Sequence, residues 1–333
     1  MSETFKAIVV NQTEKDFTRE VKSIDKSFLK HGDVLVKVDY SGLNYKDALI
    51  IRNGAKLVKE FPHIPGIDFS GTVIESENKN YTEGDEVILT GWRVGEIYYG
   101  GYSQIAKVNG EFLVKKPKDI TAKQAMILGT AGFTALMCSF AVKAKEELLL
   151  GEKVNNVLVT GATGGVGSIA VMVLAKLGYN VTAVTRKSEH SDYLKSIGAK
   201  TILNSNDFEK DPRPLDKGLW DCAVDTVGGK ILANVLAQIK DAGIVAACGN
   251  ASDYKLSTTV MPFIIRGVKL WGINSVSTSK KRREFIWNEA VNLIDFEKLD
   301  QSVKVISLEE LLKVYLKMLK GETSGRYIID LNK

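Results

Sequence analysis

A glycine-rich turn between an apolar strand pattern and a helix pattern of small residues constrains this chain most. The stretch Val157–Ala170 reads VLVTGATGGVGSIA and carries four glycines in its turn. Glycine is needed there because the backbone angles exclude most residues and because a missing Cβ lets N–H groups approach a pyrophosphate. The layout is typical of a dinucleotide-binding βα turn. On the G-x-G-x-x-G pattern the three positions are Ala162, Gly164 and Gly167, so the match is slightly off-pattern.

The next strand pattern indicates which dinucleotide is bound. It covers Asn180–Thr185 and runs into Arg186 and Lys187, with no carboxylate before Glu189. A carboxylate there would take the ribose hydroxyls of NAD, whereas Thr, Arg and Lys would bind a 2′-phosphate by charge-assisted hydrogen bonds. The sequence therefore predicts NADP(H). The alternative is that Arg186 and Lys187 are a solvated charge pair before a helix.

Strand and helix patterns then alternate, which predicts a parallel, doubly wound sheet. Asp225 and the pair Gly249-Asn250 end two of the strands, at the edge where such sheets bind ligands. A plain turn or helix cap is the competing interpretation for each glycine there. The predicted elements are a helix over Ser188–Gly198, a strand over Lys200–Leu203, a strand over Asp221–Asp225, a helix over Lys230–Lys240 and strands over Gly243–Gly249 and Val268–Asn274.

The two ends of the chain have a different texture. Short strand patterns separated by turns run from Phe5 to about Lys116, which predicts a β-rich domain. A helix pattern over Leu308–Lys320 and a strand pattern over Gly325–Asp330 close the chain, and such a tail commonly completes an earlier domain. We therefore predict three segments. They are residues 1–125 of the β-rich domain, an inserted nucleotide-binding domain at 126–275, and a return to the β-rich domain at 276–333.

Composition is that of an ordinary globular protein. A chain of 333 residues is long enough for two cores. The net charge of +5 suits an anionic ligand and is too small to argue for nucleic acid. We find no apolar run long enough for a bilayer and no signal pattern at the start. The three cysteines lack paired spacing, which favours buried thiols, a reducing compartment and a cytoplasmic location.

Seven motifs in order carry a family resemblance over nearly the whole chain. This set resembles the medium-chain dehydrogenase/reductase superfamily, and more narrowly its zinc-free quinone oxidoreductase and acryloyl-CoA reductase branch. The resemblance implies a GroES-like catalytic domain interrupted by a Rossmann domain, and a homodimer joined through Val268–Asn274. The motifs are SGLNYKDALI (Ser41–Ile50), FPHIPGIDFSGTV (Phe61–Val73), GDEVILTGW (Gly84–Trp92), GTAGFTA (Gly129–Ala135), VTGATGGVG (Val159–Gly167), DTVGG (Asp225–Gly229) and GRYIID (Gly325–Asp330).

Departures from the zinc-dependent members indicate a metal-free reaction. Those members carry Gly-His-Glu where this chain has Gly66-Ile67-Asp68, and a cysteine near the position of Asn44. A catalytic zinc needs about three Cys, His or carboxylate ligands, and we see no such set. Without a Lewis acid, alcohol oxidation is disfavoured, because nothing stabilises an alkoxide.

A metal-free NADPH enzyme needs an acceptor that is already activated, such as an α,β-unsaturated carbonyl or a quinone. Hydride addition to the β-carbon leaves charge on the carbonyl oxygen, which hydrogen-bond donors stabilise. The cluster Asn44-Tyr45-Lys46-Asp47 offers such donors, and the resemblance, which is close at Asn44 and Tyr45, places this segment beside the nicotinamide. We predict Tyr45 and Asn44 as catalytic residues, with packing at a domain seam as the alternative for Tyr45. The predicted cofactor contacts are Tyr45, Thr130, Thr163, Gly164, Gly165, Val166, Thr185, Arg186, Lys187, Asp225, Gly249, Asn250 and Arg326.

Four further residues have competing interpretations. For Arg326 the alternative to cofactor contact is an exposed arginine at a strand end. Asp68 replaces a metal-ligand position, so it either lies in the cleft or forms a structural ion pair with Lys46 or Arg52, and we expect the ion pair. Trp92 and Arg93 either line the substrate channel or belong to a surface loop.

Three functions follow, in order of preference. The first is NADPH-dependent reduction of a short 2-enoyl-CoA such as acryloyl-CoA. The second is quinone reduction by the same fold. The third is an NADPH-binding protein that binds RNA, against which stands the absence of a basic stripe interleaved with aromatic residues.

Overall fold

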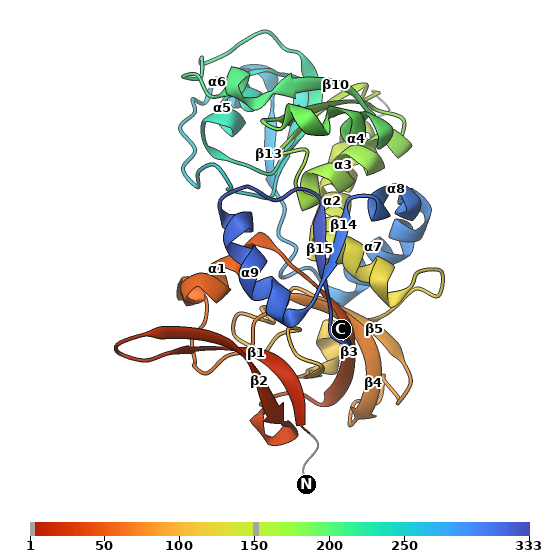
Figure 1. Cartoon of the computed structure of the whole chain (residues 1–333). Coiled ribbons are helices and arrows are strands. Elements are labelled where there is room, and N and C mark those ends of the chain that lie inside the picture. The colour runs from red at the N-terminus through yellow and green to blue at the C-terminus, as the bar shows by residue number, and fades with distance from the viewer. Residues whose placement is uncertain (1–3, 149–152) are drawn as a thin grey trace. The chain divides into compact units, whose positions relative to one another are not determined.

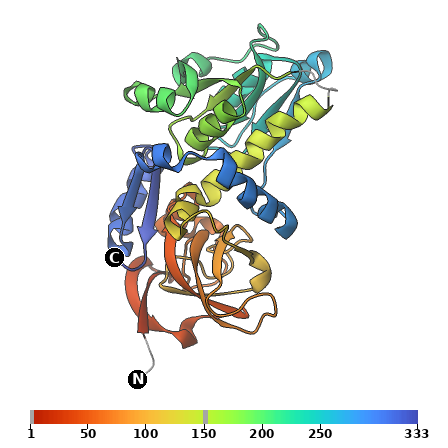
Figure 2. The same ribbon diagram turned by 90° about the vertical axis from the view of Figure 1, so that its right-hand side faces the viewer.

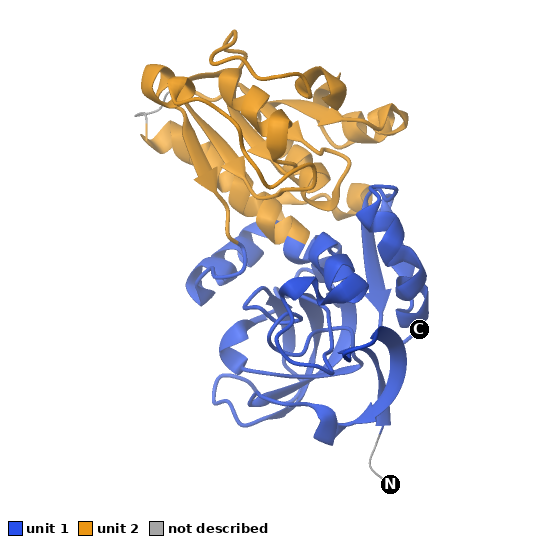
Figure 3. Ribbon diagram, turned by 90° about the vertical axis from the view of Figure 1, so that its left-hand side faces the viewer, with its two compact units in different colours: residues 1–130, 275–291, 300–333 blue, residues 131–274, 292–299 orange. Residues whose placement is uncertain are grey.

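The computed structural model of this chain describes residues 4–148 and 153–333. They divide into two compact units, coloured separately in Figure 3. Unit 1 holds residues 1–130, 275–291 and 300–333, and unit 2 holds residues 131–274 and 292–299. Residues 292–299 thus belong to unit 2, whereas the predicted division assigns them to the returning catalytic segment.

Unit 1 is built on strands from both ends of the chain, which pair mostly antiparallel, while β14 and β15 pair parallel. Its seven-stranded sheet has the order β14-β15-β3-β4-β5-β7, with β6 paired to β3, and β1 and β2 form a separate hairpin. The C-terminal strand β15 pairs with β3 through Ile328 opposite Gly42, and the first and last strands, β1 and β15, both belong to this unit (Figure 2). The strands are β1 Thr4–Gln12, β2 Phe17–Asp25, β3 Val34–Gly42, β4 Asp68–Ser76, β5 Glu86–Thr90, β6 Ile105–Val108, β7 Leu113–Lys115, β14 Val303–Ile306 and β15 Arg326–Asp330.

Helices complete unit 1. Helix α9 (Leu308–Leu319) carries an apolar stripe, and its Leu311 and Tyr315 join one buried cluster with Ile8, Val36 and Phe69. Burial of such side chains contributes about 1.5–3 kcal/mol each. The other helices that contribute residues are α1 Tyr45–Asn53, the start of α2 Ala122–Leu148, and α7 Lys280–Leu293.

Unit 2 is built on a six-stranded parallel sheet with the order β10-β9-β8-β11-β12-β13. Its two outer strands, β10 and β13, are labelled in Figure 1. The chain runs outward from β8 in both directions, which is the doubly wound arrangement and confirms the predicted fold class. Leu158, Ala223 and Val245 of its central strands are fully buried, as expected of a sheet covered by helices. Its elements are β8 Asn156–Thr160, α3 Gly165–Lys176, β9 Asn180–Thr185, α4 Ser191–Ser196, β10 Ala199–Asn204, β11 Trp220–Asp225, α5 Gly229–Ala237, β12 Ile239–Ala247, α6 Met261–Arg266, β13 Lys269–Gly272 and α8 Phe296–Asp300.

Two predicted boundaries in unit 2 were wrong. The helix predicted over Lys230–Lys240 ends at Ala237, because Ile239 already pairs with Trp220 as the start of β12. Tertiary pairing overrides the helix pattern there. The helix predicted over Ser188–Gly198 is a short 3₁₀ turn, Ser188–His190, followed by α4.

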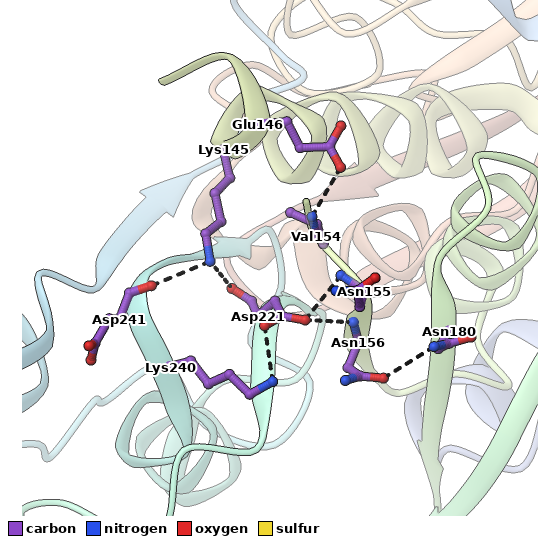
Figure 4. Close-up of polar contacts among 9 residues, drawn as sticks. All are labelled: Lys145, Glu146, Val154, Asn155, Asn156, Asn180, Asp221, Lys240 and Asp241. Carbon is purple, nitrogen blue, oxygen red and sulfur yellow. Dashed lines mark hydrogen bonds and ion pairs between the residues drawn. The ribbon is translucent and has the colours of Figure 1, made fainter. Parts of the chain in front are cut away.

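Helix α2 corrects the prediction about apolar runs. It is long and apolar enough to cross a membrane by length and composition, but its apolar window is 89% buried inside the protein. Its apolar side chains therefore serve packing. Its last turn is tied to the sheet of unit 2 (Figure 4), where Lys145 donates to the carbonyl oxygens of Asp221 and Asp241 at 3.5 and 3.3 Å.

The Asp221 carboxylate joins the same end of the sheet. It accepts the N–H groups of Asn155 and Asn156 at 3.0 and 2.7 Å and pairs with Lys240 at 3.1 Å (Figure 4). Burial acts to raise the pKa of Asp221, but these donors together hold it below its usual range. One carboxylate, that of Asp221 in β11, thus joins β11 to the first residues of β8 and β12.

Candidate active site

The βα turn of unit 2 begins at Gly161. This residue has φ of 58°, and a Cβ there would lie 2.3 Å from the Thr226 hydroxyl. Only glycine fits such a position. The left-handed residue is therefore one place earlier than Ala162, the position aligned with the first glycine of the pattern. That shift explains why alanine is tolerated in the motif.

Helix α3 presents an open N-terminus, as predicted for an anion site. Gly164 is its N-cap, no side chain caps the helix, and its first turn has no acidic residue. A Cβ on Gly164 would meet only the Gly161 carbonyl oxygen, at 3.2 Å. The first N–H groups of a helix lack intrahelical partners and favour a negative group. Gly165 and Val166 of this turn are therefore suited to hold a pyrophosphate.

The end of β9 carries the residues predicted to bind a 2′-phosphate. Thr185 is buried, and its hydroxyl oxygen lies 3.2 Å from that of Thr163 and accepts the Lys187 N–H at 3.0 Å. Arg186 is exposed. Burial, and secondarily the charge of Arg186, lower the pKa of Lys187, while Glu189 acts in the opposite direction. An added anion at this strand end would favour the charged form of Lys187.

Asp225 holds together the strand ends next to the turn. Its carboxylate is fully buried and accepts the Thr160 hydroxyl at 2.7 Å and the Gly228 N–H at 2.8 Å. Burial raises its pKa, and those donors oppose the rise. Both oxygens are thus engaged within unit 2, and the predicted contacts of Asp225, Gly249 and Asn250 with the cofactor stay predictions.

Unit 1 contains the second group of predicted residues, at the start of α1. Asn44 is the N-cap of this helix. Its amide nitrogen Nδ2 donates to Asp47 Oδ2 at 3.1 Å and to Asp68 Oδ2 at 2.9 Å. Its Oδ1 accepts from Arg326 at 3.3 Å. The Asn44 amide is therefore committed to its neighbours, while Tyr45, the next residue, is 40% exposed.

Asp68 is the centre of this polar cluster. It is fully buried and accepts the Gly42 N–H at 2.8 Å and the Thr130 N–H at 2.7 Å, in addition to the Asn44 amide. Charge-assisted bonds of this kind offset the cost of burying a carboxylate. The predicted ion pair of Asp68 with Lys46 or Arg52 is wrong, because Lys46 pairs with Glu96 at 2.7 Å instead.

Arg326 supplies positive charge to the same cluster from β15. It is 4% exposed, which rules out an exposed arginine at a strand end. Its guanidinium donates to the carbonyl oxygens of Ile127 at 3.0 Å and of Leu43 and Met126 at 3.3 Å each. Burial lowers the pKa of Arg326, and the charge of Asp68 counteracts it. In unit 1, Arg326 thus joins β15 to α1 and α2, and its contact with cofactor stays a prediction.

Two buried groups of the cluster, Asp47 and Tyr102, were not among the predicted site residues. Asp47 accepts the Ile67 N–H at 2.9 Å and the Asn44 N–H at 3.1 Å. Burial, and then the charge of Asp68, raise the pKa of Asp47 to about 7. Tyr102 donates to the Gly42 carbonyl at 2.9 Å, and burial raises its pKa well above the usual value. The N-x-x-D spacing after the N-cap could have indicated Asp47, whereas nothing local singles out Tyr102.

A kink in α2 makes room for these groups. Gly129 has φ of 51°, and a Cβ there would lie 2.8 Å from Asp68 Oδ2 and 2.9 Å from an Arg326 nitrogen. The kink lets the Thr130 N–H reach Asp68. The glycine is therefore required both by its backbone angle and by close approach.

Trp92 and Arg93 lie in the loop after β5. Both have positive φ, 54° and 62°. Trp92 stacks on Phe112 with ring centroids 5.4 Å apart, and the Arg283 guanidinium lies 5.0 Å from its ring. Arg93 is exposed at the side chain, with its Nε 3.5 Å from Glu96 Oε2. A rigid loop of unit 1 thus carries one packed and one exposed residue.

The described residues include no cluster of potential metal ligands. Across residues 4–148 and 153–333, no group of three or more His, Cys, Asp and Glu side chains could hold a metal ion. The three cysteines are free thiols, two of them buried. The positions that the resemblance assigns to metal ligands, at Asn44 and Asp68, are occupied by residues that hydrogen-bond to each other.

Two protein-family models match this chain. The model described as alcohol dehydrogenase GroES-like domain matches residues 30–118, and the one described as zinc-binding dehydrogenase matches residues 165–295. Acrylyl-CoA reductase AcuI of Ruegeria pomeroyi is 44% identical over 98% of this chain and 99% of its own length.

Two relatives with solved structures match this chain over nearly its whole length. Escherichia coli YhdH, solved with bound NADPH, is 44% identical with a TM-score of 0.93, over 98% of this chain and all of that chain. Bacillus subtilis YhfP, provisionally named a quinone oxidoreductase, is 41% identical over 99% of this chain and 100% of its own. Its structure, solved with NAD bound, has a TM-score of 0.93 and covers 99% of this chain and 100% of that one. This chain therefore belongs to the medium-chain dehydrogenase/reductase superfamily, in its zinc-free branch of acrylyl-CoA reductases and quinone oxidoreductases.

Proposed function

We propose that this protein reduces the double bond of a short 2-enoyl-CoA, acrylyl-CoA in the first place, with NADPH as the hydride donor. The observation that carries the proposal is full-length similarity at 44% identity to an acrylyl-CoA reductase. A polar cluster without a metal-ligand group among the described residues accompanies it. The chemistry fits, because an enoyl thioester is already activated toward hydride and needs no Lewis acid.

NADPH is the cofactor that the residues of unit 2 suit. The open N-terminus of α3 would hold the pyrophosphate, and Arg186 and Lys187 would hold the 2′-phosphate. NADPH, once bound, supplies the hydride. YhdH, at 44% identity, was solved with NADPH, and YhfP, at 40%, was solved with NAD. The cations after Thr185 favour the phosphorylated form.

Tyr45 is the residue of unit 1 best suited to act on the substrate. Its side chain is 40% exposed at the start of α1, so its hydroxyl is available to the charge that develops on a thioester oxygen or to the α-carbon proton. Asn44 is a positioning residue, because its amide holds Asp47 and Asp68. We therefore propose Tyr45 as the catalytic residue and Asn44 as the residue that positions its neighbours.

Quinone reduction is the second candidate. YhfP, 41% identical over the whole chain, carries that name provisionally. A quinone is likewise activated toward hydride without a metal, so the same cluster would serve.

A homodimer formed through β13 completes the proposal. This strand is the outer strand of its sheet, and all four of its residues are exposed. Leu270 and Trp271 on it are 38% and 39% exposed, and Ile264 and Ile265 of α6 are 70% and 57% exposed. Edge strands with exposed apolar residues pair readily with another chain. Pairing of two such strands would join two sheets and cover these residues.

Steady-state kinetics tests the reaction. NADPH absorbance should fall when acrylyl-CoA is added to the protein, more slowly with crotonyl-CoA, and little with a benzoquinone or naphthoquinone. Activity should survive treatment with a chelator. A much higher kcat/KM for the quinone would favour the second candidate, and activity that is lost with chelator and restored by zinc would contradict the metal-free reaction.

A further inference from the structure

We propose that Lys46 and Arg93 bind the phosphate groups of the coenzyme A portion of the substrate. The inference rests on the proposed reduction of an acyl-CoA and adds the residues that would select it over an uncharged quinone. Its basis is one nearly buried carboxylate in unit 1, that of Glu96, which pairs with two cations whose side chains are more exposed than its own. Glu96 accepts Lys46 Nζ at 2.7 Å and lies 3.5 Å from Arg93 Nε. The Glu96 side chain is 5% exposed, against 33% for Lys46 and 45% for Arg93.

The charges of this group do not cancel. Two cations face one carboxylate, which leaves one unit of positive charge. Within the described part of the chain, the Arg93 side chain makes only its Nε contact with Glu96. Its two terminal nitrogens are therefore available. A guanidinium held through Nε presents these two donors as a fork, which matches phosphate oxygens in a bidentate pair.

The backbone that carries Arg93 is held in a strained conformation. Trp92 and Arg93 have φ of 54° and 62°, and positive φ at non-glycine residues costs of order 1–3 kcal/mol each. The Arg93 carbonyl accepts the N–H groups of Glu96, Ile97 and Tyr98 at 3.1, 2.9 and 3.3 Å. The Trp92 N–H donates to the Val276 carbonyl at 2.9 Å. Strain that the surroundings hold in this way is typical of binding sites.

The position of the group suits an acyl-CoA. Lys46 directly follows Tyr45, and its bond to Glu96 brings the first turn of α1 to the loop that carries Ile97 and Tyr98. Those two side chains are 39% and 38% exposed. A loop that carries both exposed apolar side chains and a cation would suit a pantetheine arm that ends in phosphates. The residues suited to the phosphates of NADPH lie in unit 2, so the anion site in unit 1 is left for the second phosphorylated ligand.

The test compares whole and truncated thioesters in variants Lys46→Ala, Arg93→Ala and the double variant. Arg52→Ala is the matched control, because Arg52 is an exposed cation in the last turn of the same helix. We measure the Kd of propionyl-CoA by calorimetry with NADP⁺ present, and kcat/KM for acrylyl-CoA and for the acrylyl thioester of N-acetylcysteamine. Loss of a charge-assisted phosphate contact should weaken propionyl-CoA binding about tenfold or more.

The assignment depends on whether the variants lose affinity and activity for the CoA thioesters alone. The double variant should lose affinity and kcat/KM for the CoA thioesters only, should keep its kcat/KM for the truncated thioester, and should show a weaker salt dependence of propionyl-CoA binding. Arg52→Ala should match the wild type throughout. Equal losses for both thioesters, or none for either, would overturn the assignment. A merely structural role for the Glu96 group predicts equal losses.

The two proposals fail separately. A wild type that reduces acrylyl-CoA, with a double variant that binds propionyl-CoA normally, would refute this site alone. A wild type that binds propionyl-CoA through Arg93 but does not reduce acrylyl-CoA would retain this site and refute the reductase.

Discussion

Asn44 Nδ2 lies 2.9 Å from Asp68 Oδ2, and this hydrogen bond links the N-cap of α1 to the first residue of β4. The same nitrogen lies 3.1 Å from Asp47 Oδ2. One amide therefore separates two buried carboxylates that would otherwise repel each other. The arrangement commits the Asn44 amide to Asp47, Asp68 and Arg326.

Asn44→Ala should lower both stability and activity. It leaves two buried carboxylates short of a donor, which costs about 1–3 kcal/mol for each unsatisfied group. Urea unfolding followed by circular dichroism measures the loss. Tyr45→Phe is the comparison: because Tyr45 is exposed, kcat should fall with the midpoint of unfolding unchanged. If both variants lowered kcat alone, the supporting role of Asn44 would be wrong.

Asp47 should make stability depend on pH. Burial and the charge of Asp68 raise its pKa to about 7, above the value of about 3.9 for an unfolded chain. The folded state then holds a proton that the unfolded state has lost, so the free energy of unfolding falls as pH rises from about 4 to 7. Arg326 and Tyr102 face the same group.

The Asp47→Asn variant isolates this effect. Its free energy of unfolding, measured by urea titration across that pH range, should fall less than that of the wild type. Asp211→Asn, at an exposed position in unit 2, is the control. Identical pH profiles for wild type and Asp47→Asn would show that Asp47 titrates normally.

Gly129→Ala should destabilise the protein by more than backbone strain explains. Its Cβ would press on the Asp68 carboxylate and on Arg326. Gly178 is the matched control, since its φ is 94° and nothing lies within 4 Å of a Cβ there. Gly178→Ala should cost about 1 kcal/mol, and Gly129→Ala at least about 2 kcal/mol. Thermal unfolding of both variants checks the difference, and equal shifts in Tm would mean that Asp68 and Arg326 move aside freely.

Arg186→Ala combined with Lys187→Ala should change cofactor preference. Loss of two charge-assisted contacts to the 2′-phosphate should raise the Kd for NADPH by about 10²-fold, with a small change for NADH. Fluorescence titration with both cofactors measures this. Equal losses for the two would refute the phosphate assignment.

Trp271→Glu should dissociate the proposed dimer. A buried, unpaired charge at an interface is strongly unfavourable, and Trp271 is the largest exposed apolar residue of β13. Sedimentation of wild type and variant measures the mass. Leu316→Glu, at another exposed apolar site, should leave the mass unchanged. A wild type that sediments as a monomer would end the proposal.

Local patterns sufficed for the sheet of unit 2. The β-branched run at Asn180–Thr185 and the glycine-rich turn after β8 need only a few neighbouring residues, and the strand and the turn both lie where the sequence predicts them. The end of the helix before Ile239 was missed, because pairing of Ile239 with Trp220 is a tertiary contact that the helix pattern does not reveal.

The polar cluster of unit 1 was only partly predictable. Asn44 and Arg326 stand out by motif, but they are 282 positions apart and meet only because β15 pairs with β3. Asp68 could be singled out, but its true neighbours could not, because Lys46 is turned toward Glu96. Tyr102 and the kink at Gly129 could not be predicted, because their roles depend on neighbours that only the completed fold brings together.

The return of β15 to unit 1 sets an order on biosynthesis. Residues 131–274 of unit 2 form one continuous stretch, so that stretch can pack while translation is still in progress. Arg326 lies in the last strand. Until it leaves the ribosome, Asp47 and Asp68 have no cationic neighbour from β15. A product that lacks β15 would therefore lack the guanidinium that contacts Leu43, Asn44, Met126 and Ile127.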